Sequence, residues 1–256
     1  MPATGHVRCG AEHGTATLML DHPPLNILTR TVLGTLRGCL DGLAADPTLR
    51  VLVLGAAGKH FSAGADVGEH LPPTWQAMIP EFLATIRQLR AFPVPVIAAV
   101  RGRCLGGGFE LVLGADLVVA GEGASFGQPE IVLGVTPPAA CALLPALAGP
   151  ARAAELVYTG DPMSADEARA AGLVARVVPD GSVDDEALAL ARRIARHSAA
   201  ALRAAKASLR TPARQHAESE ALAAAGRRYD ELMTSHDAIE GLTAFVEKRT
   251  PTWTHA

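Results

Sequence analysis

The stretch "GRCLGGGFELVLGAD" (residues 102–116) places three consecutive glycines directly before a Phe-Glu pair in an otherwise apolar run. Glycine this dense is unfavourable inside a helix, and a lone carboxylate among Leu, Val and Ala is costly to bury. A buried strand is predicted to end at Val100, and a helix is predicted to begin near Gly106. The first N–H groups of a helix lack partners within it, so this turn can form one half of an anion or oxyanion site. Taken alone, the glycines are explained equally well by close packing of helix and strand.

Strand-like and helical patterns alternate on both sides of this stretch. The alternation predicts an α/β fold with a largely parallel sheet that helices cover. Thr29 is the predicted N-cap of the first helix, in which apolar residues recur at helical spacing. The predicted elements are a hairpin of residues 7–9 and 15–20, helices at 29–46 and 74–91, and strands at 49–56, 93–100, 116–120 and 174–178.

Beyond about residue 180 the pattern is almost entirely helical. Helices are predicted over residues 183–210, 213–233 and 236–249. We therefore divide the chain into a core with the site, residues 1–197, and a helical C-terminal region, residues 198–256. The apolar stripes of these helices must pack on the core or on a partner subunit.

Composition and charge exclude several classes of protein. The 256 residues include 23 basic and 26 acidic side chains, so no basic field indicates a nucleic-acid partner. The four cysteines lie far apart without metal-ligand spacing, and no metal site or disulfide scaffold is expected. The start of the chain has no signal pattern, and the apolar run "FPVPVIAAV" is far shorter than the ~20 residues of a membrane helix. These features predict a cytoplasmic protein with no membrane partner.

Two more stretches contain residues that suggest chemistry. "KHFSAGADVGEH" (residues 59–70) follows a predicted strand, and its small residues leave backbone N–H groups accessible, although an ordinary turn would look the same. "SFGQPEIVLGV" (residues 125–135) contains Glu130 between Pro129 and an apolar run. This glutamate is either a desolvated, catalytic carboxylate or a surface residue at the end of a strand.

Together, "SAGAD", "GGGFEL" and "GQPEIVLG" resemble, in order and spacing, the crotonase (enoyl-CoA hydratase/isomerase) superfamily. The segments "HGTATLMLDHPPLNIL", "LVYTGDPMSADEARAAGLVARVV" and "DAIEGLTAFVEKRTPTW" extend the resemblance over nearly the whole chain. The resemblance implies a crotonase-like spiral of ββα units with a helical C-terminal trimerisation region. It also implies a homotrimer or a dimer of trimers.

The resemblance further implies an acyl-CoA hydratase, a lyase that adds water to an α,β-unsaturated thioester. The backbone N–H groups of Ala65 and Gly107 match the family's oxyanion hole for the thioester carbonyl. Glu110 and Glu130 match the two glutamates with which family hydratases activate water and protonate the α-carbon. Their presence favours a hydratase over members of the family that lack one of them.

Coenzyme A is part of the expected substrate, so no separate cofactor is expected. In the family its adenine lies against the "AGAD" loop, and a C-terminal lysine, often from a neighbouring subunit, reaches its phosphates. Lys248 matches that lysine, although a solvated charge at a helix end would look the same. The residues implied to bind coenzyme A are Leu25, Lys59, Ala63, Gly64, Asp66, Phe245 and Lys248.

The sequence departs from linear-chain hydratases after "PEIVLG". Where those continue with a run like "PGxGGTQRLPR", this chain has "GVTPPAACALLPALAG" (residues 134–149). The run is similar to that of cyclohexa-1,5-diene-1-carbonyl-CoA hydratases, which add water to a cyclic dienoyl thioester. The other interpretation is sequence drift in a general enoyl-CoA hydratase.

Three alternative functions stay open at this point. A double-bond isomerase needs one carboxylate and no activated water, which the paired glutamates argue against. A non-catalytic protein that binds CoA esters would not need both glutamates. Finally, "GASFG" (residues 123–127) fits the GxSxG elbow of hydrolases, but Pro129 argues against the helix that must follow Ser125.

Overall fold

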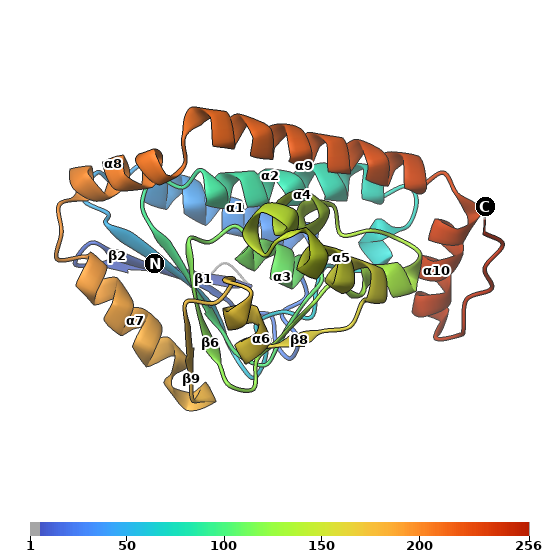
Figure 1. The fold of residues 1–256 in the computed structure, drawn as a ribbon, viewed down its shortest axis with the longest axis horizontal. Coiled ribbons are helices and arrows are strands. Elements are labelled where there is room, and N and C mark those ends of the chain that lie inside the picture. Colours follow the sequence, from blue (N-terminus) through green and yellow to red (C-terminus); the bar gives the residue numbers. More distant parts are fainter. Residues whose placement is uncertain (1–5, 256) are drawn as a thin grey trace.

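A six-stranded sheet forms the centre of the fold in the computed structural model, which describes residues 6–255 (Figure 1). Its strands are, in spatial order, β1 (Val7–Glu12), β2 (Thr15–Leu20), β3 (Val51–Ala56), β4 (Val96–Val100), β6 (Leu117–Gly121) and β9 (Arg176–Val178). β1 and β2 form an antiparallel hairpin, and every other neighbouring pair is parallel. The predicted, largely parallel sheet is therefore confirmed.

A second, three-stranded sheet was not predicted from the sequence. It consists of β5 (Arg103–Leu105), β7 (Ser125–Gly127) and β8 (Met163–Ser164). Strands of two or three residues are too short to show an alternating pattern, which is why the sequence gives no sign of them. β5 leads directly into the short helix α3 (Gly107–Val112), so this small sheet places the glycine-rich turn.

Helices cover both faces of the six-stranded sheet. On one face, α7 (Val183–Ile194) packs Val183, Ala187 and Ala191 against valines and an isoleucine of the sheet (Figure 1). On the other face lie α1 (Arg30–Ala44) and α2 (Trp75–Arg90). Thr29 is the N-cap of α1, as predicted, and its Oγ1 accepts a hydrogen bond from the N–H of Val32 at 3.2 Å.

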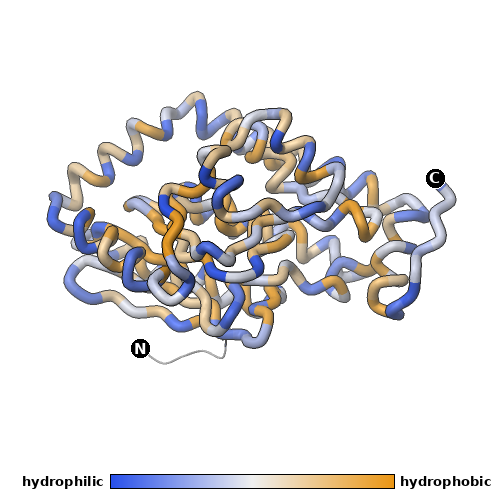
Figure 2. Tube along the Cα trace, turned by 60° about the horizontal axis from the view of Figure 1, so that its bottom comes forward, coloured by the Kyte–Doolittle hydropathy of each residue, from blue (hydrophilic) through white to orange (hydrophobic). Residues whose placement is uncertain are grey.

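The C-terminal helices pack on the core of their own chain. These helices are α8 (Ala199–Leu209), α9 (Pro212–Leu232) and α10 (His236–Glu247). α9 lies along α2 and α4 (Pro138–Leu147), and Leu222, Ala225 and Tyr229 are buried there (Figure 1). Hydrophilic and hydrophobic residues alternate along these outer helices (Figure 2), as expected where one face packs and the other meets solvent. The division of the chain at residues 197 and 198, which falls between α7 and α8, stays a prediction.

The remaining elements are short connectors around the two sheets. One of them, the 3₁₀ helix η2, carries Glu130 and packs against α10. No helix of the described residues combines the length and the apolarity needed to cross a membrane. The connectors are η1 (Gly68–His70), η2 (Pro129–Leu133), α5 (Pro150–Thr159), α6 (Ala165–Ala170) and η3 (Asp180–Ser182).

An ion pair between buried Lys206 and the more exposed Asp116 fastens α8 to the sheet. The ammonium group of Lys206, on α8, donates to Asp116 Oδ2 at 2.7 Å and to the carbonyl oxygen of Val94 at 3.0 Å. The same carboxylate oxygen accepts the N–H of Val96 at 2.8 Å, where β4 begins. The Lys206 side chain is only 8% exposed, so its charge depends on this carboxylate for compensation.

We expect Asp116→Ala to lower the free energy of unfolding by about 3 kcal/mol, because it leaves the Lys206 charge buried without a counter-ion. Urea unfolding of the parent and the variant measures the difference. Asp161→Ala, at an exposed aspartate, is the matched control. Equal losses in the two variants would contradict the prediction.

Candidate active site

Two loops that are about forty residues apart in the sequence meet in the structure. A Cβ atom built on Gly107 would lie 3.3 Å from the Cβ of Ala65, and one built on Gly64 would lie 3.8 Å from the nitrogen of Gly107. Ala65 and Gly107 both line the same small cavity. Within the described residues, neither of their backbone N–H groups donates a hydrogen bond to another residue. Two free donors therefore lie side by side at this cavity.

Gly106 and Gly108, in the run of three consecutive glycines, are each required for a different physical reason. Gly106 has φ +52°, and a Cβ there would lie 2.6 Å from Glu130 Oε1. A Cβ on Gly108 would lie 2.6 Å from the Cβ of Ser62. Since real Cβ atoms do not approach that closely, Gly108 permits close packing of the two loops and Gly106 leaves room for a carboxylate. Both interpretations of the glycine run thus apply, at different positions.

Asn26 holds the first of these loops in place. Its side-chain amide donates to the carbonyl oxygens of Ala57 at 2.9 Å and His60 at 2.8 Å. Its own carbonyl oxygen accepts the hydroxyl of Ser62 at 2.8 Å. The Asn26 side chain is fully buried, so these bonds are shielded from competing water. Asn26 was not predicted as a site residue, because the loop that it binds lies more than thirty residues away in the sequence.

Glu110 and Glu130 line the cavity together with Ala65 and Gly107. Glu110 projects from α3, is 3% exposed, and accepts the N–H of Ala140 at 2.9 Å with Oε1. That N–H belongs to the first turn of α4, where the helix dipole favours a negative charge. Glu130 is half-buried as a residue, but its Oε2 is shut off from solvent and has no hydrogen-bond partner in the described chain. The desolvated setting, and not the surface setting, applies to Glu130.

The two carboxyl groups hold their protons more tightly than ordinary glutamates. Burial raises the pKa of Glu110 to about 7, against the opposing hydrogen bonds from Ala140 and Ala139. Burial and the negative charge of Glu110 raise the pKa of Glu130 well above its usual value. Because two neighbouring carboxylates repel each other, they titrate as a pair. Near neutral pH the pair can hold one proton, which gives one acid and one base.

The other walls of the cavity are largely apolar, apart from His70, Tyr229 and Thr136. Tyr229 is buried and His70 is half-buried, and neither was predicted as a site residue, although His70 ends the quoted stretch 59–70. The His70 ring nitrogen Nδ1 lies 2.7 Å from the carbonyl oxygen of Asp66, and burial lowers the pKa of this histidine. A neutral His70 therefore donates from Nδ1 and leaves Nε2 as an acceptor. The remaining wall residues are Met78, Ile79, Phe82, Val135, Thr136 and Pro138.

The residues implied to bind coenzyme A are not all brought together. The N–H of Ala63 donates to the carbonyl oxygen of Leu25 at 2.9 Å, so Leu25 lies against the loop that also contains Gly64 and Asp66. Lys59 lies in a different hollow with Arg101 and Arg103. Phe245, which is 56% exposed, and Lys248 are at the end of α10 and do not line the glutamate cavity.

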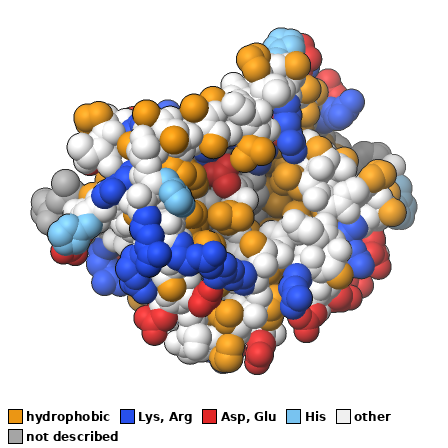
Figure 3. All heavy atoms as spheres, turned by 60° about the vertical axis from the view of Figure 1, so that its left-hand side comes forward, with side chains coloured by type: hydrophobic (Ala, Val, Ile, Leu, Met, Phe, Trp, Pro, Cys, Tyr) orange, Lys and Arg blue, Asp and Glu red, His pale blue; other side chains and the backbone are white. Residues whose placement is uncertain are grey.

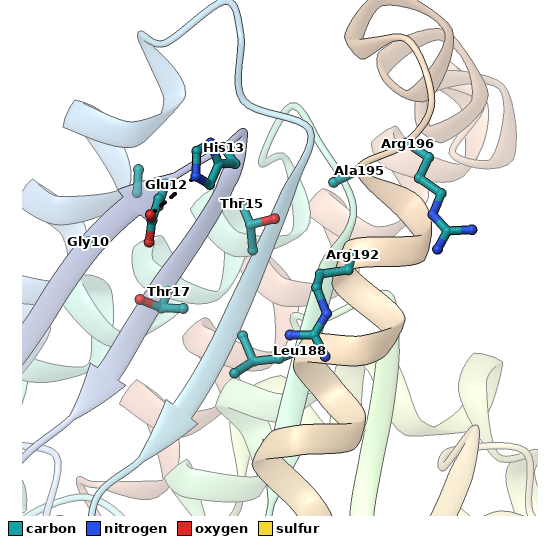
Figure 4. Close-up of a pocket in the computed structure, with 10 residues that line it drawn as sticks. Gly10, Glu12, His13, Thr15, Thr17, Leu188, Arg192, Ala195 and Arg196 are labelled. Carbon is teal, nitrogen blue, oxygen red and sulfur yellow. Dashed lines mark ion pairs between the residues drawn. The ribbon is translucent and has the colours of Figure 1, made fainter.

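A larger groove lies elsewhere, between the β1–β2 hairpin and α7 (Figure 4). It encloses about 700 Å³ and contains none of the predicted site residues. Thr15 and Thr17 of β2 face Leu188 and Arg192 of α7 across it. On this side of the molecule, Lys and Arg side chains gather beside a hollow with hydrophobic walls (Figure 3).

The hydrolase alternative has no structural basis. Ser125 begins strand β7, and the chain continues through Gln128 into the 3₁₀ helix η2. A nucleophile elbow needs its serine at a sharp turn from strand to helix. Among residues 6–255, no cluster of three or more His, Cys, Asp or Glu side chains could hold a metal ion.

The chain is similar to known proteins over nearly its whole length. The enoyl-CoA hydratase/isomerase family model matches residues 10–256. Cyclohexa-1,5-dienecarbonyl-CoA hydratase of Thauera aromatica is 38% identical over 239 residues, which cover 92% of this chain and 91% of that protein. The 2,3-dehydroadipyl-CoA hydratase of Escherichia coli K12 is 39% identical over 240 residues, which cover 91% and 92%. A crystal structure of an enoyl-CoA hydratase/isomerase from Pseudoalteromonas atlantica T6c has a TM-score of 0.89 at 28% identity and covers 97% of this chain and 100% of that one.

The chain therefore belongs to the enoyl-CoA hydratase/isomerase family. Its crotonase fold and its character as a hydratase-type enzyme, both implied by the sequence motifs, are confirmed. The roles of individual residues, the acyl group and the oligomeric state stay predictions.

The raised pKa of Glu110 makes stability depend on pH. The pKa of Glu110 in the folded protein, about 7, exceeds its ordinary value of 4.5. The contribution of Glu110 to the free energy of unfolding is therefore complete below pH 4.5 and is lost as the pH rises through about 7. We expect the parent to lose about 3 kcal/mol of unfolding free energy between about pH 5 and about pH 8 through this group. Glu110→Gln, which keeps an acceptor for Ala140, should lose less, because only the contribution of buried Glu130 remains.

Urea unfolding at both pH values measures this difference. Glu122→Gln, at an exposed glutamate, is the control and should follow the parent. A Glu110→Gln variant with the same pH dependence as the parent would show that Glu110 titrates normally.

Proposed function

We propose that the chain adds water to an α,β-unsaturated acyl-CoA thioester in the cavity between Glu110 and Glu130. The observation that carries this proposal is the pairing of two buried carboxyl groups with two free backbone donors at one cavity. Hydration needs a base for water, an acid for carbon and a site for negative charge on oxygen. Enoyl-CoA hydratases among the relatives support the same reaction class.

One ionised and one protonated glutamate are the two groups that this reaction needs. The ionised glutamate takes a proton from water while the water oxygen bonds to the β-carbon of the substrate. The electrons of the double bond move to the thioester oxygen and form an enolate. The protonated glutamate then gives its proton to the α-carbon, which balances the addition of one water molecule. Which of Glu110 and Glu130 begins as the base is left open.

The enolate oxygen is proposed to accept hydrogen bonds from the free N–H groups of Ala65 and Gly107. Each aimed donor in such a hole stabilises the transition state by roughly 3–4 kcal/mol. Gly107 is the first residue of α3, so its N–H has no partner inside the helix. The same two donors would serve an isomerase, but the second desolvated carboxyl group favours hydration.

Coenzyme A is proposed to lie along Ala63, Gly64 and Asp66, next to Leu25. Lys248 and Phe245 lie away from the glutamate cavity of their own chain, which supports a role at the site of a neighbouring subunit in a trimer. Lys59 is proposed to attract the phosphates from the hollow that it shares with two arginines.

The acyl group is proposed to be a cyclic dienoyl group. Val135, Thr136 and Pro138 belong to the run that departs from linear-chain hydratases, and all three line the glutamate cavity. This part of the sequence therefore meets the acyl end of the substrate. The 38% identity to a cyclohexa-1,5-dienecarbonyl-CoA hydratase also supports the cyclic substrate.

We expect Glu110→Gln or Glu130→Gln to lower kcat by about 10²-fold or more, because each removes one proton-transfer group. Binding of the CoA ester should survive, since the loops that hold it are unchanged. Steady-state kinetics and calorimetric titration with a substrate analogue measure the two effects. Glu122→Gln should match the parent, and near-normal turnover in either active-site variant would remove the two-carboxylate mechanism.

The acyl group is tested with crotonyl-CoA and cyclohexa-1,5-diene-1-carbonyl-CoA in ¹⁸O-water, followed by mass spectrometry. We expect labelled water to be added faster to the cyclic ester. A strong preference for crotonyl-CoA would support a general enoyl-CoA hydratase with a drifted pocket. Absence of label on both esters would overturn the proposed hydration and direct the search to isomerisation.

A further inference from the structure

Tyr229 places an unsatisfied hydroxyl group deep in the molecule. The residue is 1% exposed, and its Oη has no hydrogen-bond partner among the described residues. It comes from α9, and its ring packs against Trp75 and His70, at centroid distances of 6.5 and 6.3 Å. An unpaired buried hydroxyl costs about 1–3 kcal/mol, so its presence calls for a reason other than folding.

The Tyr229 hydroxyl is close enough to the two glutamates to be affected by their charge. Tyr229 lines the same cavity as Glu110 and Glu130. Burial, and then the negative charges of both carboxylates, raise the pKa of Tyr229 far above its usual value. The phenol therefore stays protonated at every working pH. It can exchange hydrogen bonds with a reacting group but cannot act as the base.

The cavity has the room and the polar groups that a water molecule needs. Its volume of about 30 Å³ exceeds the ~10–15 Å³ that one buried water requires. A buried water needs two to four polar partners. The walls offer the carboxyl group of Glu110, the unpartnered Oε2 of Glu130 and the unpartnered Oη of Tyr229. The apolar walls formed by Met78 and its neighbours offer none.

We propose that Tyr229 is a third catalytic residue, whose hydroxyl oxygen accepts one hydrogen of the water that the glutamates activate. The inference rests on the proposed hydration. As the water oxygen bonds to the β-carbon, its first hydrogen passes to the ionised glutamate. Its second hydrogen stays on the new hydroxyl group, which continues to donate a hydrogen bond to Tyr229 Oη. The phenol keeps its own proton throughout, so the proton balance of the reaction is unchanged.

The role predicts opposite effects on stability and on turnover. Tyr229→Phe keeps the ring and its contacts with Trp75 and His70, and removes only the unpartnered oxygen. The melting temperature should therefore stay the same or rise. The water would lose one of its partners, so kcat should fall about tenfold. The KM for the thioester should change by less than about twofold, because the ground-state contacts of coenzyme A are elsewhere.

Tyr158→Phe is the matched control, because Tyr158 is the other tyrosine of the chain and is 76% exposed. The experiment measures kcat, KM and the melting temperature of the parent and both variants with the thioester that the parent hydrates fastest. A fall in kcat for Tyr229→Phe alone, at unchanged or raised melting temperature, supports the inference.

Other results overturn it. Unchanged kcat in Tyr229→Phe, with an active parent, removes the role of the hydroxyl and leaves the proposed hydration standing. A lowered melting temperature with a proportional loss of active enzyme assigns the hydroxyl to folding. A parent that hydrates neither crotonyl-CoA nor cyclohexa-1,5-diene-1-carbonyl-CoA removes the proposed function, and the inference falls with it.

Discussion

The closeness of two carboxyl groups in a site without bulk water is the constraint on which the rest of the site depends. Glu110 and Glu130 repel each other when both are ionised, and burial adds to the cost. The protein offsets part of this cost with the N-terminus of α4, whose Ala140 N–H binds Glu110. It leaves space for Glu130 by having no side chain at position 106. The remaining cost appears as raised pKa values, which are the property that acid–base chemistry near neutral pH requires.

The fold brings these groups together from three separate segments of the chain. The small sheet ends in the turn before α3 and so fixes Gly107 and Glu110. The loop after β3 brings Ala65 against that turn. The Asn26 side chain holds this loop through two hydrogen bonds to its carbonyl oxygens. From the far end of the chain, α9 closes the cavity over α2 and α4. The site is therefore assembled by packing between distant segments, and the large sheet serves as its rigid support.

The sequence predicted what depends on local periodicity and on motifs. The parallel strands, α1 with its Thr29 cap and the helical C-terminal part were all recognisable because their patterns are longer than a turn. The two glutamates and the two backbone donors were found through motif order, and the structure brings them to one cavity. The small sheet was not predictable, because strands of two or three residues carry no period. Asn26, His70 and Tyr229 were missed since their significance comes only from contacts across long stretches of chain.

Gly106 and Glu130 also limit how this sequence can change over generations. A side chain at position 106 would displace the carboxylate of Glu130 and would stand at φ +52°, so such a change is tolerated better after residue 130 has become smaller. Once position 106 carries a side chain, a glutamate at position 130 has to place its carboxylate elsewhere. A lineage that gives up the second carboxylate for one-carboxylate chemistry, and then fills the vacated space, therefore returns to hydration less easily.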